Sequence, residues 1–113
     1  MKPIPPRLQK LYPYHWPASP NGLPNKLAAR PATIGNPFEV EIYGRQAAIE
    51  LYPLWIFETL LRGDCQAKRL RMALRRARGC NLLCYCKPGE ACHADWLLEL
   101  LNADALSVHV LKP

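Results

Sequence analysis

The chain of 113 residues is long enough for one domain and too short for a second domain with its own core. Half of its residues are hydrophobic and 21% are charged, a globular composition, and no apolar run approaches the roughly 20 residues of a membrane helix. Its 15 lysines and arginines outnumber nine acidic residues, and the net charge of +6 favours anionic partners. These counts exclude a multidomain protein, and we expect a soluble chain with no membrane partner.

Seven of the 12 prolines fall within the first 24 residues, which excludes an uninterrupted helix or a central strand there. We therefore predict an irregular, extended, Pro-rich arm over residues 1–29. The arm is expected either to lie across its own domain or to dock a protein partner, because it also carries apolar side chains: Leu8, Leu11, Tyr12, Tyr14 and Trp16. The first six residues lack the apolar region of a secretory signal, so we expect a reducing, cytoplasmic setting.

Residues 30–113 are predicted to form one compact domain, beginning with a turn at Gly35-Asn36-Pro37. Apolar residues alternate with glutamates over residues 38–42, which predicts a short strand or an extended approach to a helix. Helical spacing of apolar residues follows from residue 45 to residue 61. Pro53 interrupts this helix and is expected to bend it, and Gly63 is expected to end it.

A second helix is predicted from Asp64, its N-cap, to about residue 78, with Gly79 at its C-terminal end. Residues 81–86 are apolar throughout, as in a strand buried on both faces, and Cys92 or His93 begins a third helix. Residues 106–111 alternate as a final strand. This order predicts the α/β class: a small layered domain with a short, mostly parallel sheet and packed helices.

The junction between the buried strand and the third helix is the best candidate for chemistry, since ligands of open α/β sheets bind beyond the carboxyl ends of the strands. The helix start accepts anions and lowers the pKa of a thiol beside it. The candidate catalytic residues are a thiol nucleophile with an acid or base and an orienting carboxylate: Cys86, Cys92, His93 and Asp95. The candidate ligand-binding residues are Arg30, Asn36, Lys87, Gly89, Cys92 and His93.

Zinc is a possible cofactor of this junction, because Cys3His is a common ligand set and Cys84, Cys86, Cys92 and His93 lie close in sequence. On a regular strand, however, Cys84 and Cys86 would stand about 6.5–7 Å apart. Two helical neighbours such as Cys92 and His93 would diverge by about 100°. We therefore predict no metal unless the backbone is irregular there. Cys65 and Cys80 belong to no such cluster and are predicted core residues.

The second predicted helix carries five of the six units of net charge, from six cations and one acid. Arginine predominates, and its planar fork suits phosphate oxygens, so a nucleic acid or a nucleotide is the expected partner. An ordinary solvated face is the alternative. The candidate nucleic-acid residues are Lys68, Arg69, Arg71, Arg75, Arg76 and Arg78.

Several of these segments together resemble an uncharacterised bacterial and phage family, number 4326 of the domains of unknown function. The resemblance covers residues 30–102 and rests on Arg30, on Gly35-Asn36-Pro37-Phe38, on Ala47, Tyr52 and Trp55, on the strand Leu-Leu-Cys-Tyr-Cys, and on Cys92-His93-Ala94-Asp95. It implies a compact α/β domain, often phage-encoded, with Arg30 and Asn36 near the 86–95 loop. It implies no established activity.

We expect a small domain that binds a nucleotide or nucleic-acid phosphate, used, if phage-encoded, in host takeover or anti-defence. Two alternatives stay open: a cysteine-dependent enzyme acting on a nucleotide-like substrate, and a zinc-stabilised protein-interaction module.

Overall fold

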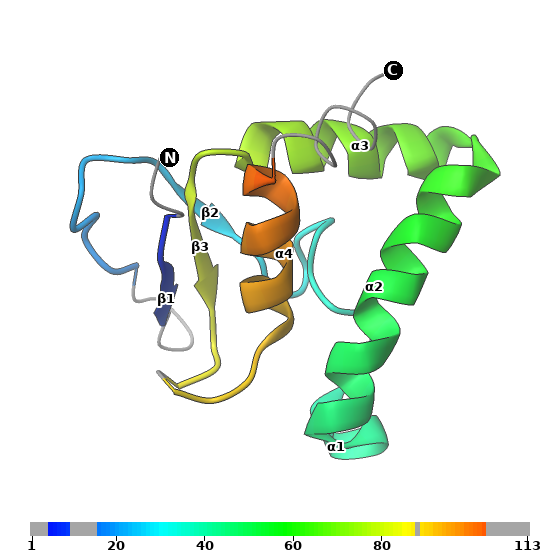
Figure 1. Ribbon diagram of the computed structural model, residues 1–113, viewed down its shortest axis with the longest axis horizontal. Coiled ribbons are helices and arrows are strands. Elements are labelled where there is room, and N and C mark those ends of the chain that lie inside the picture. The colour runs from blue at the N-terminus through cyan, green and yellow to red at the C-terminus, as the bar shows by residue number, and fades with distance from the viewer. Residues whose placement is uncertain (1–4, 10–15, 88, 104–113) are drawn as a thin grey trace.

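The structure, a computed structural model, describes residues 5–9, 16–87 and 89–103. In these ranges the chain forms strands β1 (Arg7–Gln9), β2 (Asn25–Leu27) and β3 (Asn81–Cys84) and helices α1 (Val40–Tyr43), α2 (Arg45–Arg62), α3 (Cys65–Ala77) and α4 (His93–Asn102) (Figure 1). The strands make one parallel sheet in the order β1-β3-β2. The predicted class, a small α/β domain with a parallel sheet, is confirmed.

The central strand β3 is buried at all four positions, as its apolar sequence predicts. Leu83 pairs with Leu8 on one side and with Leu27 on the other. The strand ends at Cys84, two residues before the predicted end, and Tyr85 and Cys86 form a bend. This early end decides how the cysteines are placed.

Both outer strands come from the segment that we predicted as an arm beyond the compact domain. Each follows a proline, and the carbonyls of Pro6 and Pro24 accept hydrogen bonds from the Leu82 and Asn81 amides. Proline is tolerated at the start of an edge strand because its missing N–H is not needed there. Residues 7–9 and 25–27 of this segment thus belong to the sheet of the domain, and residues 20–22 between them form a bend.

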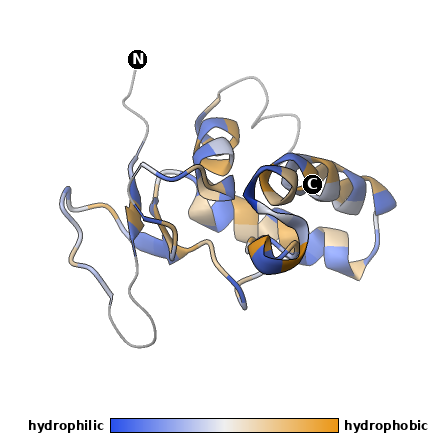
Figure 2. Ribbon diagram, turned by 90° about the horizontal axis from the view of Figure 1, so that it is seen from below, coloured by the Kyte–Doolittle hydropathy of each residue, from blue (hydrophilic) through white to orange (hydrophobic). Residues whose placement is uncertain are grey.

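Helices α2 and α3 match their predicted ranges closely. Gly63 ends α2 in the left-handed conformation, with φ of 71°, and the Asp64 carboxylate caps α3 by accepting from the Ala67 amide at 2.9 Å. The predicted inner stripe of α3 is fully buried: Ala67, Leu70, Leu74 and Ala77. In Figure 2, hydrophilic and hydrophobic residues alternate around the helices, as this amphipathic pattern requires.

Two further predictions differ from the structure, and a third concerns residues that the structure does not describe. Residues 40–43 form a helical turn instead of a strand, because the Tyr43 and Gly44 amides bond back to the Glu39 and Val40 carbonyls. Cys65 is exposed at the first position of α3, on the side away from the buried stripe, whereas Cys80 is buried as predicted. The final strand predicted over residues 106–111 lies outside the described residues.

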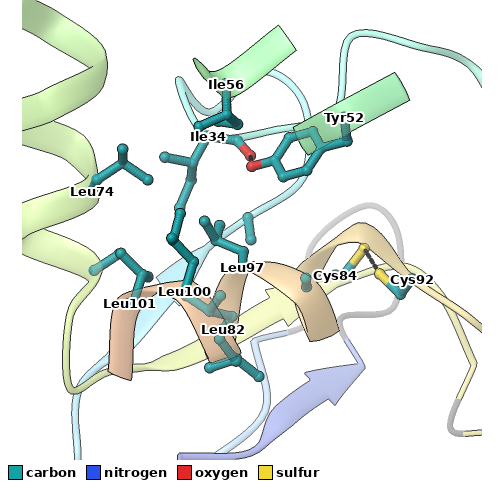
Figure 3. Close-up of a cluster of buried hydrophobic side chains, with 14 of the residues drawn as sticks. Ile34, Tyr52, Ile56, Leu74, Leu82, Cys84, Cys92, Leu97, Leu100 and Leu101 are labelled. Atoms are coloured by element: carbon teal, nitrogen blue, oxygen red, sulfur yellow. Dashed lines mark hydrogen bonds between the residues drawn. The ribbon is translucent and has the colours of Figure 1, made fainter. Parts of the chain in front are cut away.

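The core lies between the sheet and the helices, with α4 packed against β1, β3, α2 and α3. Figure 3 shows Leu82 of β3, Leu97 and Leu101 of α4, and Ile56 and Tyr52 of α2 meeting there. Along the parts of the chain that the structure describes, none of the helices is long and apolar enough to cross a membrane.

The hydroxyl of Thr59 in α2 is buried and has no hydrogen-bond partner among the described residues. Burying an unpaired hydroxyl costs free energy, and valine has nearly the same shape. We expect Thr59→Val to raise the free energy of unfolding by about 1 kcal/mol. Urea unfolding of the two chains measures the difference, and a less stable variant would contradict it.

Candidate functional site

The junction between β3 and α4 brings three cysteines and a histidine together. Cys84 is the last residue of β3, and Cys86 follows in the bend. Cys92 is the N-cap of α4 and has an extended backbone, with φ of −146° and ψ of 145°, and His93 is the first helical residue. The bend at Cys86 and the extended backbone of Cys92 both turn their side chains inward. A regular strand and a regular helix would hold these side chains apart.

The three sulfur atoms are in contact. The Sγ atoms of Cys84 and Cys86 lie 3.7 Å apart, and those of Cys92 and Cys84 lie 3.2 Å apart (Figure 3 shows the second pair). The Cys92 thiol donates to Cys84, and the Cys84 thiol donates to Cys86. The hydrogen bond from Cys84 is the largest cause that lowers the pKa of Cys86, whereas the pKa values of Cys84 and Cys92 are raised.

His93 is held as a neutral imidazole with one nitrogen directed at the sulfurs. Its Nε2 hydrogen-bonds the Ala28 carbonyl, which can only accept, so Nε2 carries the proton and Nδ1 presents its lone pair. Nδ1 lies 3.8 Å from the Cys92 Sγ. Burial lowers the pKa of His93, and the Tyr52 ring packs against the imidazole with centroids 4.7 Å apart.

These donor atoms form a group that could hold a metal ion. Cys84, Cys92 and His93 are all buried, and one ligand atom of each lies within 4.8 Å of the others. The irregular backbone that we expected a metal site to require is present here. The strand ends before Cys86, so its sulfur turns toward Cys84, and Cys92 is extended, so its side chain does not diverge from His93 as a helical neighbour would.

A pocket of about 380 Å³ opens beside this cluster, at the carboxyl ends of β2 and β3. Arg30, after β2, and Arg45, at the start of α2, line it together with Cys86 and His93. The pocket thus joins segments that are far apart in sequence. Its remaining lining residues are Ala29, Asn36, Phe38, Val40, Glu41, Cys84, Tyr85 and Glu90.

The two arginines of the pocket are held by glutamates. Arg30 pairs with Glu39 at 3.2 Å, and Arg45 pairs with Glu90 at 3.3 Å. Arg45 also donates to the Ala91 carbonyl at 3.0 Å and to the Cys86 Sγ at 3.5 Å. Both pairs are more than one third exposed, so each bond is weak enough to be exchanged for a ligand.

Asn36 positions the wall of the pocket. Its side-chain amide donates to the Ala48 carbonyl of α2 at 2.9 Å, and its oxygen accepts from the Phe38 amide at 3.0 Å. Gly35 packs against the backbone of Ala29 and Arg30, so the turn follows directly on the end of β2. The turn therefore fixes the place of Arg30 relative to α2.

Sequence reasoning missed two residues of the site, Arg45 of the pocket wall and Arg7. From β1, the guanidinium of Arg7 donates to the Asp95 carboxylate at 2.8 Å and to the carbonyls of Glu90 at 2.8 Å and Cys86 at 3.3 Å. It therefore ties the loop between β3 and α4 to the sheet. Asp95 is engaged by Arg7, whereas the Ala28 carbonyl orients His93.

The other predicted site residues lie at the edge of the pocket or far from it. Lys87 and Gly89 are exposed in the loop and do not line the pocket, although the Lys87 amide donates to the Glu90 carboxylate at 2.7 Å. The basic residues of α3 lie at the end of the sheet where β3 begins, away from the pocket where β3 ends (Figure 1).

The chain belongs to the family described as Domain of unknown function (DUF4326), whose model matches residues 22–103. This match includes the turn at Gly35, the three cysteines and His93, and it leaves out Arg7. Neither the comparison with curated proteins nor the comparison with solved structures gave a match.

Proposed function

We propose that this protein binds a small phosphate-bearing ligand, of the nucleotide class, in the pocket at the carboxyl ends of β2 and β3. The observation that carries this proposal is that two arginines, Arg30 and Arg45, line the same pocket. Arginine binds phosphate oxygens with two parallel N–H bonds, and two arginines match the charge of a phosphate monoester.

The surroundings of the arginines support the same ligand class. The pocket volume of about 380 Å³ is in the range of small-ligand sites. Phe38 and Tyr85 offer aromatic surface on which a base could stack. Helices α2 and α4 both begin beside the pocket without a side-chain cap, and their first turns present the positive ends of the helix dipoles.

Glu39 and Glu90 hold the arginines until a ligand takes their place. A phosphate dianion offers three acceptor oxygens, whereas each arginine contacts one oxygen of its glutamate, so the exchange favours the ligand. This geometry favours binding over the cysteine-enzyme alternative, because Asp95 pairs with Arg7 instead of orienting His93.

Arg30→Ala is expected to weaken nucleotide binding at least tenfold without changing stability, since the ion pair that Arg30 makes among the described residues, with Glu39, is exposed. Calorimetric titration of the full chain with nucleoside mono-, di- and triphosphates and with inorganic phosphate measures the affinity. Arg62→Ala is the matched control, because Arg62 pairs with an exposed acid at the far end of α2. Equal affinity in the Arg30 variant, or no binding by the parent chain, would reject the proposal.

A nucleic-acid phosphate is the second candidate ligand, and the observation that favours it is the exposed basic side of α3. Opposite its buried stripe, the helix exposes Lys68, Arg69, Arg75, Arg76 and Arg78, and Arg71 is half-buried. We expect single-stranded oligonucleotide binding whose affinity falls steeply with salt, and Arg69→Glu with Arg76→Glu is expected to abolish it. Fluorescence anisotropy at two salt concentrations measures this, and a salt-independent affinity would contradict it.

We also propose that the metal-capable cluster of Cys84, Cys92 and His93 holds zinc, which prefers thiolate and imidazole ligands and stabilises small domains. When bound, zinc would tie the end of β3 to the start of α4. Native mass spectrometry of the full chain, prepared without chelators, is expected to show one zinc ion that is lost on denaturation. A chain of unmodified mass after zinc addition would contradict this.

A further inference from the structure

We infer that Cys86 is the fourth ligand of the metal ion, and that it is the most exposed of the four ligands on the pocket side. This inference rests on the proposal that Cys84, Cys92 and His93 hold zinc. It adds that the metal centre forms part of the pocket wall instead of a closed structural site behind it.

The distances between the donor atoms support four ligands. Two thiolates on one tetrahedral zinc ion stand about 3.8 Å apart, and a thiolate and an imidazole nitrogen about 3.6 Å apart. The Cys84 and Cys86 sulfurs are separated by 3.7 Å, and the Cys92 sulfur and the His93 Nδ1 by 3.8 Å. The Cys92 to Cys84 distance of 3.2 Å must widen. The Cys86 sulfur must also move closer to the other donor atoms, because the group whose atoms lie within 4.8 Å of one another includes Cys84, Cys92 and His93 but not Cys86.

The second shell of the cluster also suits a metal ion. A zinc-bound histidine usually donates its other nitrogen to a carbonyl or carboxylate, as His93 donates Nε2 to Ala28. Zinc with three thiolates and a neutral imidazole carries one net negative charge. Arg45 donates to the Cys86 sulfur, and Arg7 donates to the Cys86 carbonyl, so two cations lie where this charge would be.

The four proposed ligands differ in exposure, and the most exposed of them lies on the side of the cluster that faces the pocket. Cys84, Cys92 and His93 are 4%, 3% and 7% exposed, whereas Cys86 is only half-buried. Cys86 also lines the pocket beside Arg45 and Glu90. If Cys86 is removed, the position it leaves opens to the pocket, and a three-ligand site with one open position is the arrangement of reactive zinc centres.

The test uses the full chain loaded with cobalt(II), whose thiolate charge-transfer absorption counts bound sulfur. Three bound thiolates are expected in the parent chain and in Cys65→Ala, the control for an exposed cysteine outside the cluster. Cys86→Ala is expected to keep the cobalt and to lose about one third of the absorption, the share of one thiolate in three. Added 2-mercaptoethanol is expected to restore it by entering through the pocket. In Cys92→Ala, whose gap is buried and does not line the pocket, the same thiol is expected to restore nothing.

The outcomes separate this inference from the proposals on which it rests. Undiminished absorption in Cys86→Ala would overturn the fourth ligand and leave the zinc proposal standing, whereas a parent chain without cobalt or zinc would end both. Two results would each refute the inference that the position left by Cys86 is open to the pocket. One is a folded Cys86→Ala chain that binds no cobalt, and the other is a failure of 2-mercaptoethanol to restore its absorption. X-ray absorption of the zinc-loaded parent chain needs no variant: three sulfurs and one nitrogen support the inference, and two sulfurs refute it.

Discussion

Replacing Gly35 with alanine is expected to lower the free energy of unfolding by about 3 kcal/mol or more, because the new methyl group has no space. A Cβ atom at this position would lie 2.6 Å from the Arg30 nitrogen and 2.8 Å from the Ala29 carbonyl carbon. Both are backbone atoms, so no side-chain rotation relieves the contact. The backbone conformation of Gly35 is not left-handed, so the effect is steric alone.

The atoms that Gly35 touches cannot easily move. The Ala28 amide donates to the Leu83 carbonyl of β3 at 2.8 Å, and the Ala28 carbonyl accepts from His93. Moving this stretch would therefore disturb both the sheet and the cysteine cluster.

Urea unfolding measures the effect of Gly35→Ala, and a melting temperature lower by about 10 °C is expected beside it. Thr33→Ala is the matched control, since Thr33 is an exposed residue of the same turn and its truncation is expected to be neutral. A Gly35→Ala chain as stable as the control would show that the turn does not pack on the backbone of Ala29 and Arg30 in solution.

Sequence reasoning succeeded where the signal is local. The ends of α2 and α3 were predictable from Gly63 and Asp64, whose conformational freedom and side-chain oxygen act within one turn of the chain. The buried stripe of α3 and the apolar strand β3 were predictable from periodicity alone. The meeting of Arg30 with the Cys86 loop was implied by the family resemblance and not by any spacing along the chain.

Other features depend on contacts between distant residues and left no local signal. Strands β1 and β2 have three residues each, too few for a period, and they are strands only because both edges of β3 accept partners. The meeting of the cysteines depends on an irregular backbone at Cys86 and Cys92, which no local sequence signal could establish. A bend of two residues and one extended N-cap were enough to bring the sulfurs together.

Arg7→Ala is expected to destabilise the loop that carries Cys86 and Glu90. Arg7 hydrogen-bonds both residues although they lie about 80 positions away in the sequence. Its side chain is 11% exposed and makes two hydrogen bonds to the loop between β3 and α4 and one to Asp95 in the first turn of α4. Hydrogen bonds from a charged group contribute more than neutral ones, and we expect a loss of about 2 kcal/mol in the free energy of unfolding.

A larger effect is expected on the loop than on the domain. Without Arg7, the loop keeps Arg45 as its tie to α2 but loses its tie to β1. Local opening should then cost less free energy than global unfolding, so hydrogen exchange over residues 86–92 should rise more than in β3. Arg7→Lys keeps the charge but cannot reach three acceptors at once, and it should fall between alanine and arginine.

Lys26→Ala is the matched control for this prediction, because Lys26 is an exposed residue on the opposite outer strand. If hydrogen exchange over residues 86–92 were the same in Arg7→Ala as in this control, the prediction that Arg7 holds the loop to β1 would be wrong. Arg7 also lies outside residues 22–103, the range that the family model matches. If the loop opens as expected, the site of this protein is completed by a residue that the family pattern does not include, and β1 is part of the binding machinery as well as of the sheet.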